Sequence, residues 1–451
     1  MRVDLLIAEI GSTTTVVNAF SGIHGESPRF LGQGLAATSI GEGDVTLGLD
    51  RAREQLARIL GVSSLESEEV FATSSAAGGL SMTVHGLVPE MTVRAAREAA
   101  LGSGAVLKAV TCGHLRDHDI QGILAARPRI ILIAGGTDGG ERETALHNFI
   151  KLAEALPGTP FLYAGNAANQ DEIRSLAREK EIKVYVTENV YPSLDQLNIE
   201  PARALIQAIF EEHIVEAPGM AHIHEAVTGP IMPTPGAVMA MAEILYGEMG
   251  DLLALDVGGA TTDVHSVTRG NEALNEFRID PEPLAKRTVE GDLGVYVNRE
   301  HVLDAMSARE KESLPKDYQN LLRSVPEVPG DQDQAALILP LVRTCCREAL
   351  DRHAGRMREQ YTPQGRRTVV RGRDLTAVRT LIGTGGALTR LEGAGDLLND
   401  LLREADPERL YPPPDLNVMI DRDYLMASCG VMARSYPAAA VRILFQSLTR
   451  E

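Results

Sequence analysis

The sequence has little of what builds a disulfide-bonded, aromatic-rich or metal-clustered protein. Tryptophan is absent and aromatic residues make up 4% of the 451 residues, so we expect a core of Leu, Ile, Val and Ala. The cysteines lack the spacing of zinc ribbons and redox pairs, which favours ordinary thiols in a reducing compartment. They are Cys112, Cys345, Cys346 and Cys429.

Positive charge and long apolar runs are also scarce. Lys and Arg total 44 against 62 for Asp and Glu, and the formal net charge of −18 disfavours nonspecific binding of nucleic acid. The N-terminal apolar run stops at Glu9, and the run over residues 335–342 is too short to cross a bilayer. We therefore expect a cytoplasmic protein with no membrane partner and no nucleic-acid partner.

The length and the patterning predict two α/β domains with an insertion. A chain of 451 residues exceeds what one hydrophobic core usually serves. Strand patterns and helix patterns alternate along it, which is typical of α/β proteins. The predicted first domain comprises residues 1–80 and 215–247, the inserted α/β subdomain covers 81–214, and the second domain covers 248–451 with a helical insertion around 300–373.

Two glycine turns far apart in the chain share one pattern. The first follows a strand that ends with Glu9 and Ile10, and the second follows a strand that ends with Asp256 and Val257. Glycine permits positive φ and lets the backbone approach an anion closely, so free N–H groups and Thr hydroxyls are predicted to bind phosphate oxygens. The predicted phosphate-binding residues are Gly11, Ser12, Thr13, Thr14, Gly258, Gly259, Thr261 and Thr262.

The acid before each turn and a third turn complete the predicted nucleotide site. Mg²⁺ on phosphates prefers carboxylates and water, so Glu9 and Asp256 are predicted to face each other across a cleft and to hold Mg²⁺ through water or orient the attacking water. The third turn leaves a strand and begins a helix, where glycine can lie against adenosine or bind an α-phosphate. Its predicted ligands are Gly383, Gly385 and Gly386. No Gly-Lys-Ser/Thr follows any of these turns, which excludes a Walker-type P-loop.

The order of these turns resembles that of the actin, sugar kinase and Hsp70 ATPase superfamily, and residues 256–263 resemble its hydantoinase A branch. Over nearly the whole chain the sequence is similar to the glutamate mutase accessory proteins, called MutL although unrelated to the mismatch-repair protein of that name. The resemblance rests on residues 76–80, 134–140, 163–166, 187–190, 233–235 and 421–437. It implies an α/β fold of two actin/hexokinase/Hsp70-like ATPase lobes, each ribonuclease H-like, with the inserted α/β subdomain and with hinge helices over 235–245 and 424–434.

By this resemblance the protein is a slow ATPase that acts as a reactivating chaperone and exchanges damaged cobalamin in an adenosylcobalamin-dependent mutase, either glutamate mutase or an aminomutase. ATP or ADP with Mg²⁺ would be its cofactors, and mutase subunits its partners. Position 9 is Glu where the superfamily usually has Asp, so Asp256 is predicted to be the more important acid. Two alternatives stay open: a small-molecule kinase or ATP-dependent lactam hydrolase on the same fold, and a nucleotide-gated interaction protein that does not hydrolyse ATP.

Three further features carry open alternatives. Asp138 follows a buried strand where open α/β sheets place ligand contacts, so it is a candidate for the nucleotide site or for a kinase base; stabilising its turn is the alternative. Asp263 follows the second hairpin's Thr pair and is a candidate nucleotide-site residue. A local concentration of arginines is either a helix face paired with acids or a docking surface for an acidic partner. Its members are Arg347, Arg352, Arg356, Arg366, Arg367, Arg371 and Arg373.

Overall fold

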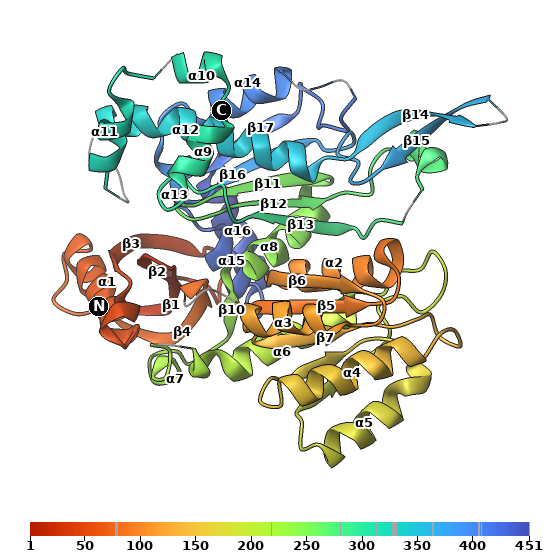
Figure 1. Ribbon diagram of the computed structural model, residues 1–451. Helices are drawn as coiled ribbons and strands as arrows, with labels where there is room; N and C mark the ends of the chain where they lie inside the picture. Colours follow the sequence, from red (N-terminus) through yellow and green to blue (C-terminus); the bar gives the residue numbers. More distant parts are fainter. Residues whose placement is uncertain are drawn as a thin grey trace. The chain divides into compact units, whose positions relative to one another are not determined.

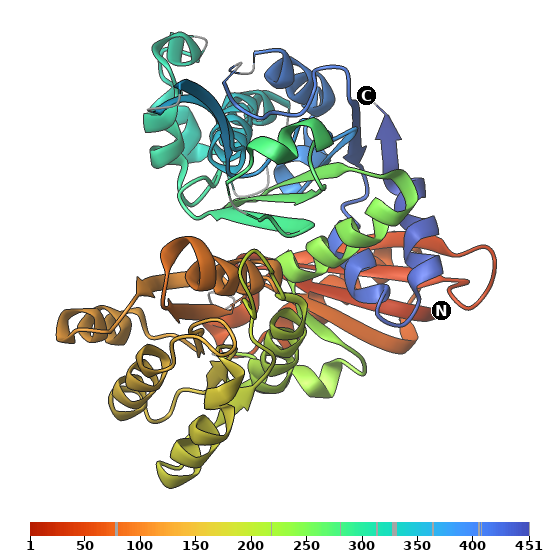
Figure 2. The same ribbon diagram turned by 90° about the vertical axis from the view of Figure 1, so that its right-hand side faces the viewer.

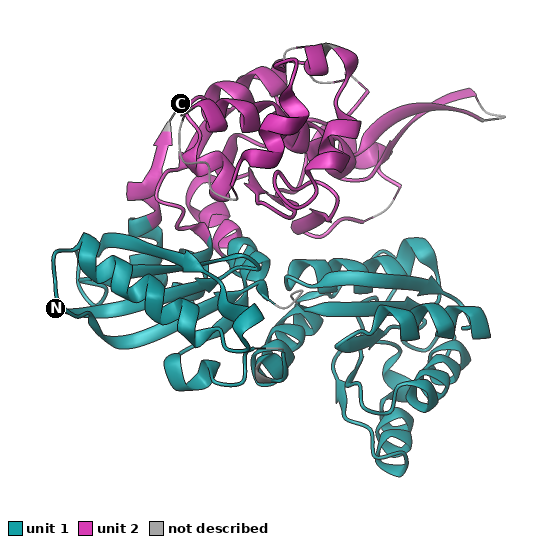
Figure 3. Ribbon diagram, turned by 60° about the vertical axis from the view of Figure 1, so that its left-hand side comes forward, with its two compact units in different colours: residues 1–240, 427–443 teal, residues 241–426, 444–451 magenta. Residues whose placement is uncertain are grey.

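The computed structural model describes residues 1–76, 80–217, 219–279, 281–312, 314–326, 332–362, 365–404, 406 and 408–450. Residues 77–79 of the quoted 76–80 motif therefore lie outside the described residues. The chain forms two compact units (Figure 3). Unit 1 comprises Met1–Ala240 and Ala427–Ile443, and unit 2 comprises Met241–Met426 and Leu444–Glu451. The chain passes between them within α8 (Thr234–Met249), at the start of α15 (Met426–Met432) and within α16 (Pro437–Ser447).

The first sheet of unit 1 has its strands in the order β10-β4-β1-β2-β3 (Figure 1). The strands are β1 (Arg2–Ile10), β2 (Thr14–Ser21), β3 (Arg29–Ala37), β4 (Glu66–Ser74) and β10 (Ile231–Pro233). β1, β2 and β3 are antiparallel, whereas β4 and β10 are parallel to β1. β1 is buried at Val3 and from Leu5 to Ile10, as a central strand requires. Helix α1 (Thr46–Ile59) buries Leu49, Ala52 and Leu56 in the core of this unit.

The second sheet of unit 1 is wholly parallel and has the order β6-β5-β7-β8-β9. Its strands are β5 (Ser81–Gly86), β6 (Val106–Cys112), β7 (Ile130–Ile133), β8 (Phe161–Tyr163) and β9 (Val184–Val186). Its helices are α2 (Arg94–Gly102), α3 (Asp117–Ala126), α4 (Glu143–Ala155), α5 (Gln170–Glu179) and α6 (Glu200–His213). Leu132 packs in one core with α2 and α6, and Ile133 packs in another with α3, α4 and α5, so helices cover both faces (Figures 1 and 2). This sheet and its helices lie within residues 81–214, the range given above for an inserted α/β subdomain, and they belong to unit 1 together with the first sheet.

The main sheet of unit 2 has the order β13-β12-β11-β16-β17-β18. Its strands are β11 (Leu252–Val257), β12 (Thr262–Val267), β13 (Ala285–Glu290), β16 (Thr380–Thr384), β17 (Asn417–Asp421) and β18 (Leu448–Arg450). β11, β12 and β13 are antiparallel, β16 and β17 run parallel to β11, and β18 is antiparallel to β17. Helices α12 (Gln332–His353) and α14 (Ala394–Arg403) contribute Leu341, Cys345 and Leu398 to its core.

The first sheet of unit 1 and the main sheet of unit 2 have the same connectivity. In each, three antiparallel strands come first along the chain, the fourth strand then pairs in parallel with the first, and the fifth pairs in parallel with the fourth. This repeated order is the one expected of two ribonuclease H-like lobes, and it confirms the predicted actin/hexokinase/Hsp70-like fold class. Each predicted phosphate hairpin joins the first and second strands of its sheet, and the third glycine turn follows the fourth strand of unit 2.

The predicted helical insertion around 300–373 is helical as far as His353. Its helices are α9 (Arg299–Ala305), α10 (Ala308–Glu312), α11 (Tyr318–Ser324) and α12. Beyond them, β14 (Arg356–Thr362) and β15 (Gly365–Arg371) form an antiparallel hairpin that projects from the rest of unit 2 (Figures 1 and 3). The helical prediction is therefore wrong over residues 356–362 and 365–371, because pairing between the two segments decides their conformation, and a dense run of arginines does not reveal that pairing.

The remaining elements are short, and the helices that carry the chain between the units are closely packed. The remaining short elements are η1 (Ser39–Glu42), η3 (Pro89–Val93), η4 (Ala167–Asn169), η5 (Ile214–Glu216), α7 (Ile223–Ala226), η6 (Glu272–Phe277) and α13 (Gly386–Arg390). An added Cβ at Gly430 of α15 would overlap the carbonyl of Ala237 on α8, so small residues permit this crossing within unit 1. Among the described residues, no helix combines the length and the apolar character of a membrane span.

Candidate functional site

The first glycine turn joins β1 to β2 and is held by Thr38. The Gly11 N–H donates to the Thr14 carbonyl at 3.0 Å. Thr38 donates through its N–H to the Thr13 carbonyl at 2.7 Å, and through Oγ1 to the Gly11 carbonyl at 2.9 Å. The N–H groups of Ser12 and Thr13 donate to no residue that the structure describes. Carbonyls of this turn are thus bonded, while the N–H groups at its centre are not.

The second turn joins β11 to β12 and is held in the same way by a different loop. The Gly258 N–H donates to the Thr261 carbonyl at 2.9 Å. The loop after β13 donates backbone N–H groups to the carbonyls of Gly258 at 3.3 Å and of Gly259 at 2.8 Å, and Asn298 Nδ2 donates to the Ala260 carbonyl at 2.7 Å. The N–H groups of Gly259 and Ala260 have no acceptor within the described part of the chain. They occupy the positions of Ser12 and Thr13 in the first turn.

The two turns therefore offer matched donors to an external acceptor. Successive unbonded amide hydrogens in a tight turn form an anion-binding concavity. At Gly11 an added Cβ would lie 2.7 Å from the Thr14 oxygen, so glycine is required there for space. At Gly258 it would lie 3.3 Å from the Thr261 oxygen, a tight contact that a small shift would relieve. Positive φ, the reason expected from the sequence, occurs at neither of these two described glycines. At Gly11 the reason for glycine is therefore the short distance to the Thr14 carbonyl and not the backbone conformation.

The two predicted acids occupy equivalent positions at the ends of β1 and β11. Glu9 lies beside Thr73 on β4, and Asp256 lies beside Thr384 on β16. Glu9 is 4% exposed and Asp256 is half-buried. Each acid stands two residues before the glycine that opens its turn. A carboxylate next to a phosphate-binding turn suits a Mg²⁺ ion that is held chiefly by phosphates and water, since such sites need one or two protein carboxylates.

The two threonines beside these acids differ in their partners. The Thr384 hydroxyl donates to Asp421 Oδ2 at 3.0 Å. Asp421 also accepts hydrogen bonds from two backbone N–H groups at the start of α15, and burial raises its pKa. The Thr73 Oγ1 is buried and has no hydrogen-bond partner among the described residues. Because an unbonded buried hydroxyl is costly, Thr73 marks a place beside Glu9 that a water or a ligand would complete.

The third glycine turn lies directly against the acid of unit 2. It leaves β16 and begins α13, as predicted, and Gly385 has a φ of 86°. An added Cβ at Gly385 would overlap Asp256 Oδ1 and would lie 2.5 Å from the Val257 nitrogen. Glycine is therefore required at this position by both conformation and space. Gly383 lies within β16, where an added Cβ would meet the core side chains of Ile420 and Leu398, and Gly386 begins α13. Of the three predicted ligands, Gly385 is therefore the one that lies against Asp256.

Two other predicted ligands of the second hairpin are engaged inside the protein. The Thr262 hydroxyl donates to the Leu293 carbonyl at 2.7 Å. Asp263 is 5% exposed, and its Oδ1 accepts from Arg287 Nε at 2.8 Å and Nη2 at 2.5 Å. Arg287 is itself 1% exposed, so this is a buried ion pair. These contacts support the base of the hairpin, and they leave Thr261 as the threonine of this turn that is partly exposed.

Asp138 lies in the loop after β7, a strand of the second sheet of unit 1. Glu9 belongs to the other sheet of that unit. Its Oδ1 accepts from the Ala167 N–H at 2.8 Å and from Asn189 Nδ2 at 2.9 Å. These bonds hold together the loops after β7, β8 and β9. They support the alternative in which Asp138 stabilises its turn. Within the described ranges, no group of three or more His, Cys, Asp or Glu side chains is arranged to hold a metal ion.

Comparison with known proteins identifies the family. A family model described as MutL protein matches residues 5–448. The chain belongs to the MutL family. It is similar to Protein MutL of Clostridium tetanomorphum, with 35% identity over 462 residues and 99% of each chain covered. The family predicted from the sequence motifs is thereby confirmed.

Solved structures resemble this MutL-family chain much more weakly. A diol dehydratase-reactivating factor in its nucleotide-free form is 12% identical, with 96% of this chain and 99% of that chain covered and a TM-score of 0.38. A nucleotide-free acetone carboxylase is also 12% identical, with coverage of 96% and 70% and a TM-score of 0.40. These TM-scores are too low to assign a function.

Sequence reasoning missed the residues that shape the MutL-family hairpins. Thr38 and Asn298 hold the two turns, but each is far from its turn in sequence, so no local pattern reveals it. Thr73 was missed as well, although a signal exists. Thr73 is the next-to-last residue of β4 and Thr384 is the last residue of β16, and a small residue follows each of them. Aligning the fourth strands of the two sheets would reveal their shared register beside an acid.

Proposed function

We propose that this chain is an ATP-dependent reactivating chaperone for an adenosylcobalamin-dependent mutase, either glutamate mutase or an aminomutase. It would bind the inactivated mutase and promote exchange of damaged cobalamin for intact coenzyme. Membership of the MutL family and the resemblance to glutamate mutase accessory proteins support this class of client. The observation that carries the nucleotide part is the matched pair of hairpin turns, each with unbonded central N–H groups three and four residues after an acid.

In this proposal both turns bind phosphate oxygens of ATP. The N–H groups of Ser12 and Thr13, and those of Gly259 and Ala260, are the donors. Mg²⁺ would be held by the phosphates and, through water, by the carboxylates at positions 9 and 256. The turn around Gly385, packed against the second acid, would contact the adenosine or the α-phosphate. The Thr73 hydroxyl would bond a water or a phosphate oxygen beside the first acid.

The nucleotide would act by favouring one conformation of the chain over another. A mutase holds its cobalamin tightly, so release of a damaged cofactor requires free energy from outside the mutase. A ligand shifts a conformational equilibrium only by the difference in its affinity for the two states, and ATP and ADP differ by one phosphate at the hairpins. Coupling between that difference and the affinity for the mutase is the reciprocal linkage that a chaperone of this kind needs.

The kinase alternative has less support than the sequence suggested. It relied on Asp138 as a base, and that carboxylate is tied to Ala167 and Asn189 on a separate sheet. The ATP-dependent lactam hydrolase remains the small-molecule alternative, and the hydrolysis-free interaction protein remains the other. Both differ from the chaperone in a measurable way, since the first turns over a substrate without a protein partner and the second releases no phosphate.

The experiment is reactivation of oxygen-inactivated glutamate mutase, and of an inactivated aminomutase in parallel. The mutase is incubated with this protein, ATP, Mg²⁺ and fresh adenosylcobalamin, and mutase activity and released phosphate are measured. We expect recovery of activity that requires ATP, and loss of that recovery in Asp256→Asn, a variant of unchanged side-chain shape. Asp138→Asn is the matched control, since it changes the same chemical group on the other sheet, and it should reactivate like the wild type.

Other outcomes would reject parts of the proposal. Recovery without ATP would reject the nucleotide requirement. Phosphate release that neither mutase stimulates, together with no recovery, would reject the chaperone role. Equal loss in Asp256→Asn and Asp138→Asn would mean that the matched turns do not define the site. ATP binding without phosphate release in the presence of either mutase would favour the interaction protein.

A further inference from the structure

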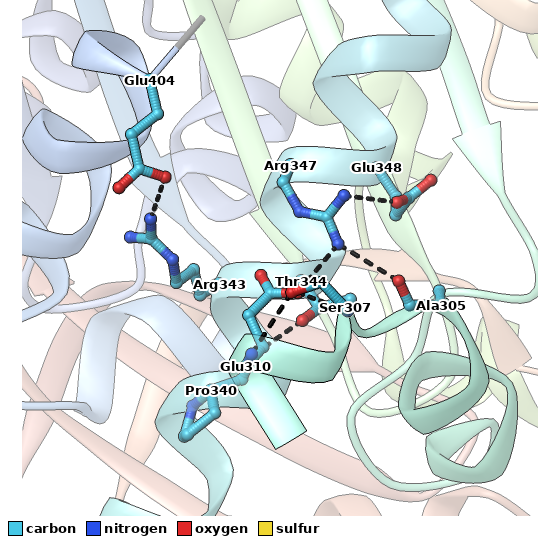
Figure 4. Close-up of polar contacts among 9 residues, drawn as sticks. All are labelled: Ala305, Ser307, Glu310, Pro340, Arg343, Thr344, Arg347, Glu348 and Glu404. Carbon is cyan, nitrogen blue, oxygen red and sulfur yellow. Dashed lines mark hydrogen bonds and ion pairs between the residues drawn. The ribbon is translucent and has the colours of Figure 1, made fainter. Parts of the chain in front are cut away.

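The arginines concentrated between positions 347 and 373 divide into a paired group and an unpaired group. On α12, Arg347 donates to Glu348 at 2.8 Å and lies 3.3 Å from Glu310 (Figure 4). The other pairs of this helix join Arg343 to Glu404, and Arg352 to Glu290 and Asp292. The helical part of the concentration is therefore neutralised locally, which is the first of the two alternatives drawn from the sequence.

The hairpin of β14 and β15, here called the arm, holds the unpaired group. Its register places Arg356 opposite Arg371 and Gln360 opposite Arg367. Side chains alternate between the faces of a ribbon, so one face carries Arg356, Arg358, Arg367, Arg371 and Val369. We call this set the arginine face. The opposite face carries Val370, which is buried, and Arg366, which pairs with Glu359.

The arginine face is exposed and has no internal counter-charge. Arg358, Arg367 and Arg371 are exposed, and none of the face's four arginines has an ion pair or a side-chain hydrogen bond with any residue in the described ranges. Like charges directly opposite on a ribbon are destabilising, as at Arg356 and Arg371. Residues 356–371 contain five arginines and one glutamate, a local net charge of +4 in a chain whose net charge is −18. A basic face that is costly and isolated in this way needs an acidic counterpart.

The arm is also shaped for contact. It projects from unit 2, and its base is fixed on both edges, since the Met357 N–H donates to the Glu408 carbonyl at 3.0 Å and the Ile279 N–H to the Val370 carbonyl at 3.2 Å (Figures 1 and 3). Val369 lies among the arginines and supplies an apolar centre. Arginine around a small apolar centre is the composition of protein interfaces, where Arg is enriched and readily forms bidentate bonds with carboxylates.

We propose that the arginine face is a docking surface for an acidic patch on a partner protein. A protein partner is favoured over nucleic acid or an anionic membrane by the rest of the chain. Those polyanions carry charge that extends far beyond an arm of this size, and the strongly acidic remainder of the chain repels them. Binding of single strands also stacks bases on exposed aromatic rings beside the basic groups, whereas the arm's Tyr361, 78% exposed, lies on the face opposite the arginine face.

The test measures binding of a fluorescent glutamate-rich peptide to the full chain by anisotropy, at low and at physiological salt. The reversal variant combines Arg358→Glu, Arg367→Glu and Arg371→Glu. The control variant combines Lys316→Glu, Arg323→Glu and Arg379→Glu, exposed cations of unit 2 that lie outside the arm. We expect the reversal variant to bind at least about tenfold more weakly than the wild type and the control variant to bind within about twofold of it, with all affinities falling as salt is raised.

A neutral variant and two competing probes make the result decisive. Replacing the same three arginines with glutamine should weaken binding less than reversal does, which separates loss of charge from damage to the arm. Circular dichroism and ATP binding report whether each variant is folded. Equal affinity of the wild type and the reversal variant would overturn the proposal. So would single-stranded DNA or phosphatidylglycerol vesicles that bind the arginine face more tightly than the peptide does.

Discussion

The buried pair of Asp263 and Arg287 allows a test of whether Asp263 supports the second hairpin or binds the nucleotide. Asp263→Asn keeps the shape of the side chain but removes the negative charge that Asp263 presents to Arg287. The partners are 5% and 1% exposed and lie 2.5 Å apart, so the relevant cost is that of breaking a buried pair and not that of losing a surface one. We expect the free energy of unfolding of unit 2 to fall by about 3 kcal/mol, the lower end of the usual range, because the amide still accepts a hydrogen bond.

Urea unfolding followed by circular dichroism gives the free energy, and hydrogen exchange of peptides from β12 and β13 assigns the loss to unit 2. The control is the double variant Asp263→Leu with Arg287→Met, which removes both charges and should lie within about 1 kcal/mol of the wild type. ATP affinity of folded Asp263→Asn should equal that of the wild type. A loss of less than about 1 kcal/mol together with weakened ATP binding would refute this reasoning and make Asp263 a nucleotide ligand, as its place in the sequence suggested.

Three further predictions concern single positions. Thr73→Val removes a hydroxyl that has no partner among the described residues, so stability should hold while ATP turnover, measured as released phosphate, falls by about tenfold. Gly385→Ala should lower the free energy of unfolding by about 2 kcal/mol and abolish ATP binding by calorimetry, because a Cβ there overlaps Asp256 at a φ of 86°. Burial, with the nearby Arg287 charge, holds the pKa of His265 well below 6.5, so its contribution to stability is complete above about pH 6.5 and declines by about 1.4 kcal/mol per pH unit below it. His265→Phe should remove that part of the slope in urea unfolding at about pH 7.5 and about pH 5.5, and an unchanged slope would contradict the assignment.

The hairpins could be predicted because all their signals are local. A strand, an acid, a glycine and a pair of threonines lie within a few residues of one another, and the same order occurs near position 9 and near position 256. The fold class followed, since a repeated hairpin implies a repeated sheet. The third turn was predictable for the same reason, because a strand pattern runs directly into Gly383 and a helix begins at Gly386.

Features that depend on register between distant strands could not be predicted. Asp263 was a candidate ligand because it follows two threonines, yet β13 brings Arg287 beside it. Likewise Thr73 gains significance only once β4 is placed beside β1. The arm belongs to a charged stretch that was predicted to be mostly helical, and only the pairing of Arg356–Thr362 with Gly365–Arg371 defines it as a hairpin.

Along the chain, the strands of the wholly parallel sheet come between β4 and β10, which are hydrogen-bonded neighbours in the first sheet. The corresponding gap in unit 2, between β16 and β17, contains α13 and α14. An inserted segment that begins and ends at adjacent strands leaves the pairing of those strands intact, whatever the length of the segment. Relatives with a longer, shorter or different inserted segment in this gap can therefore retain both glycine hairpins, and variation between lineages should concentrate there.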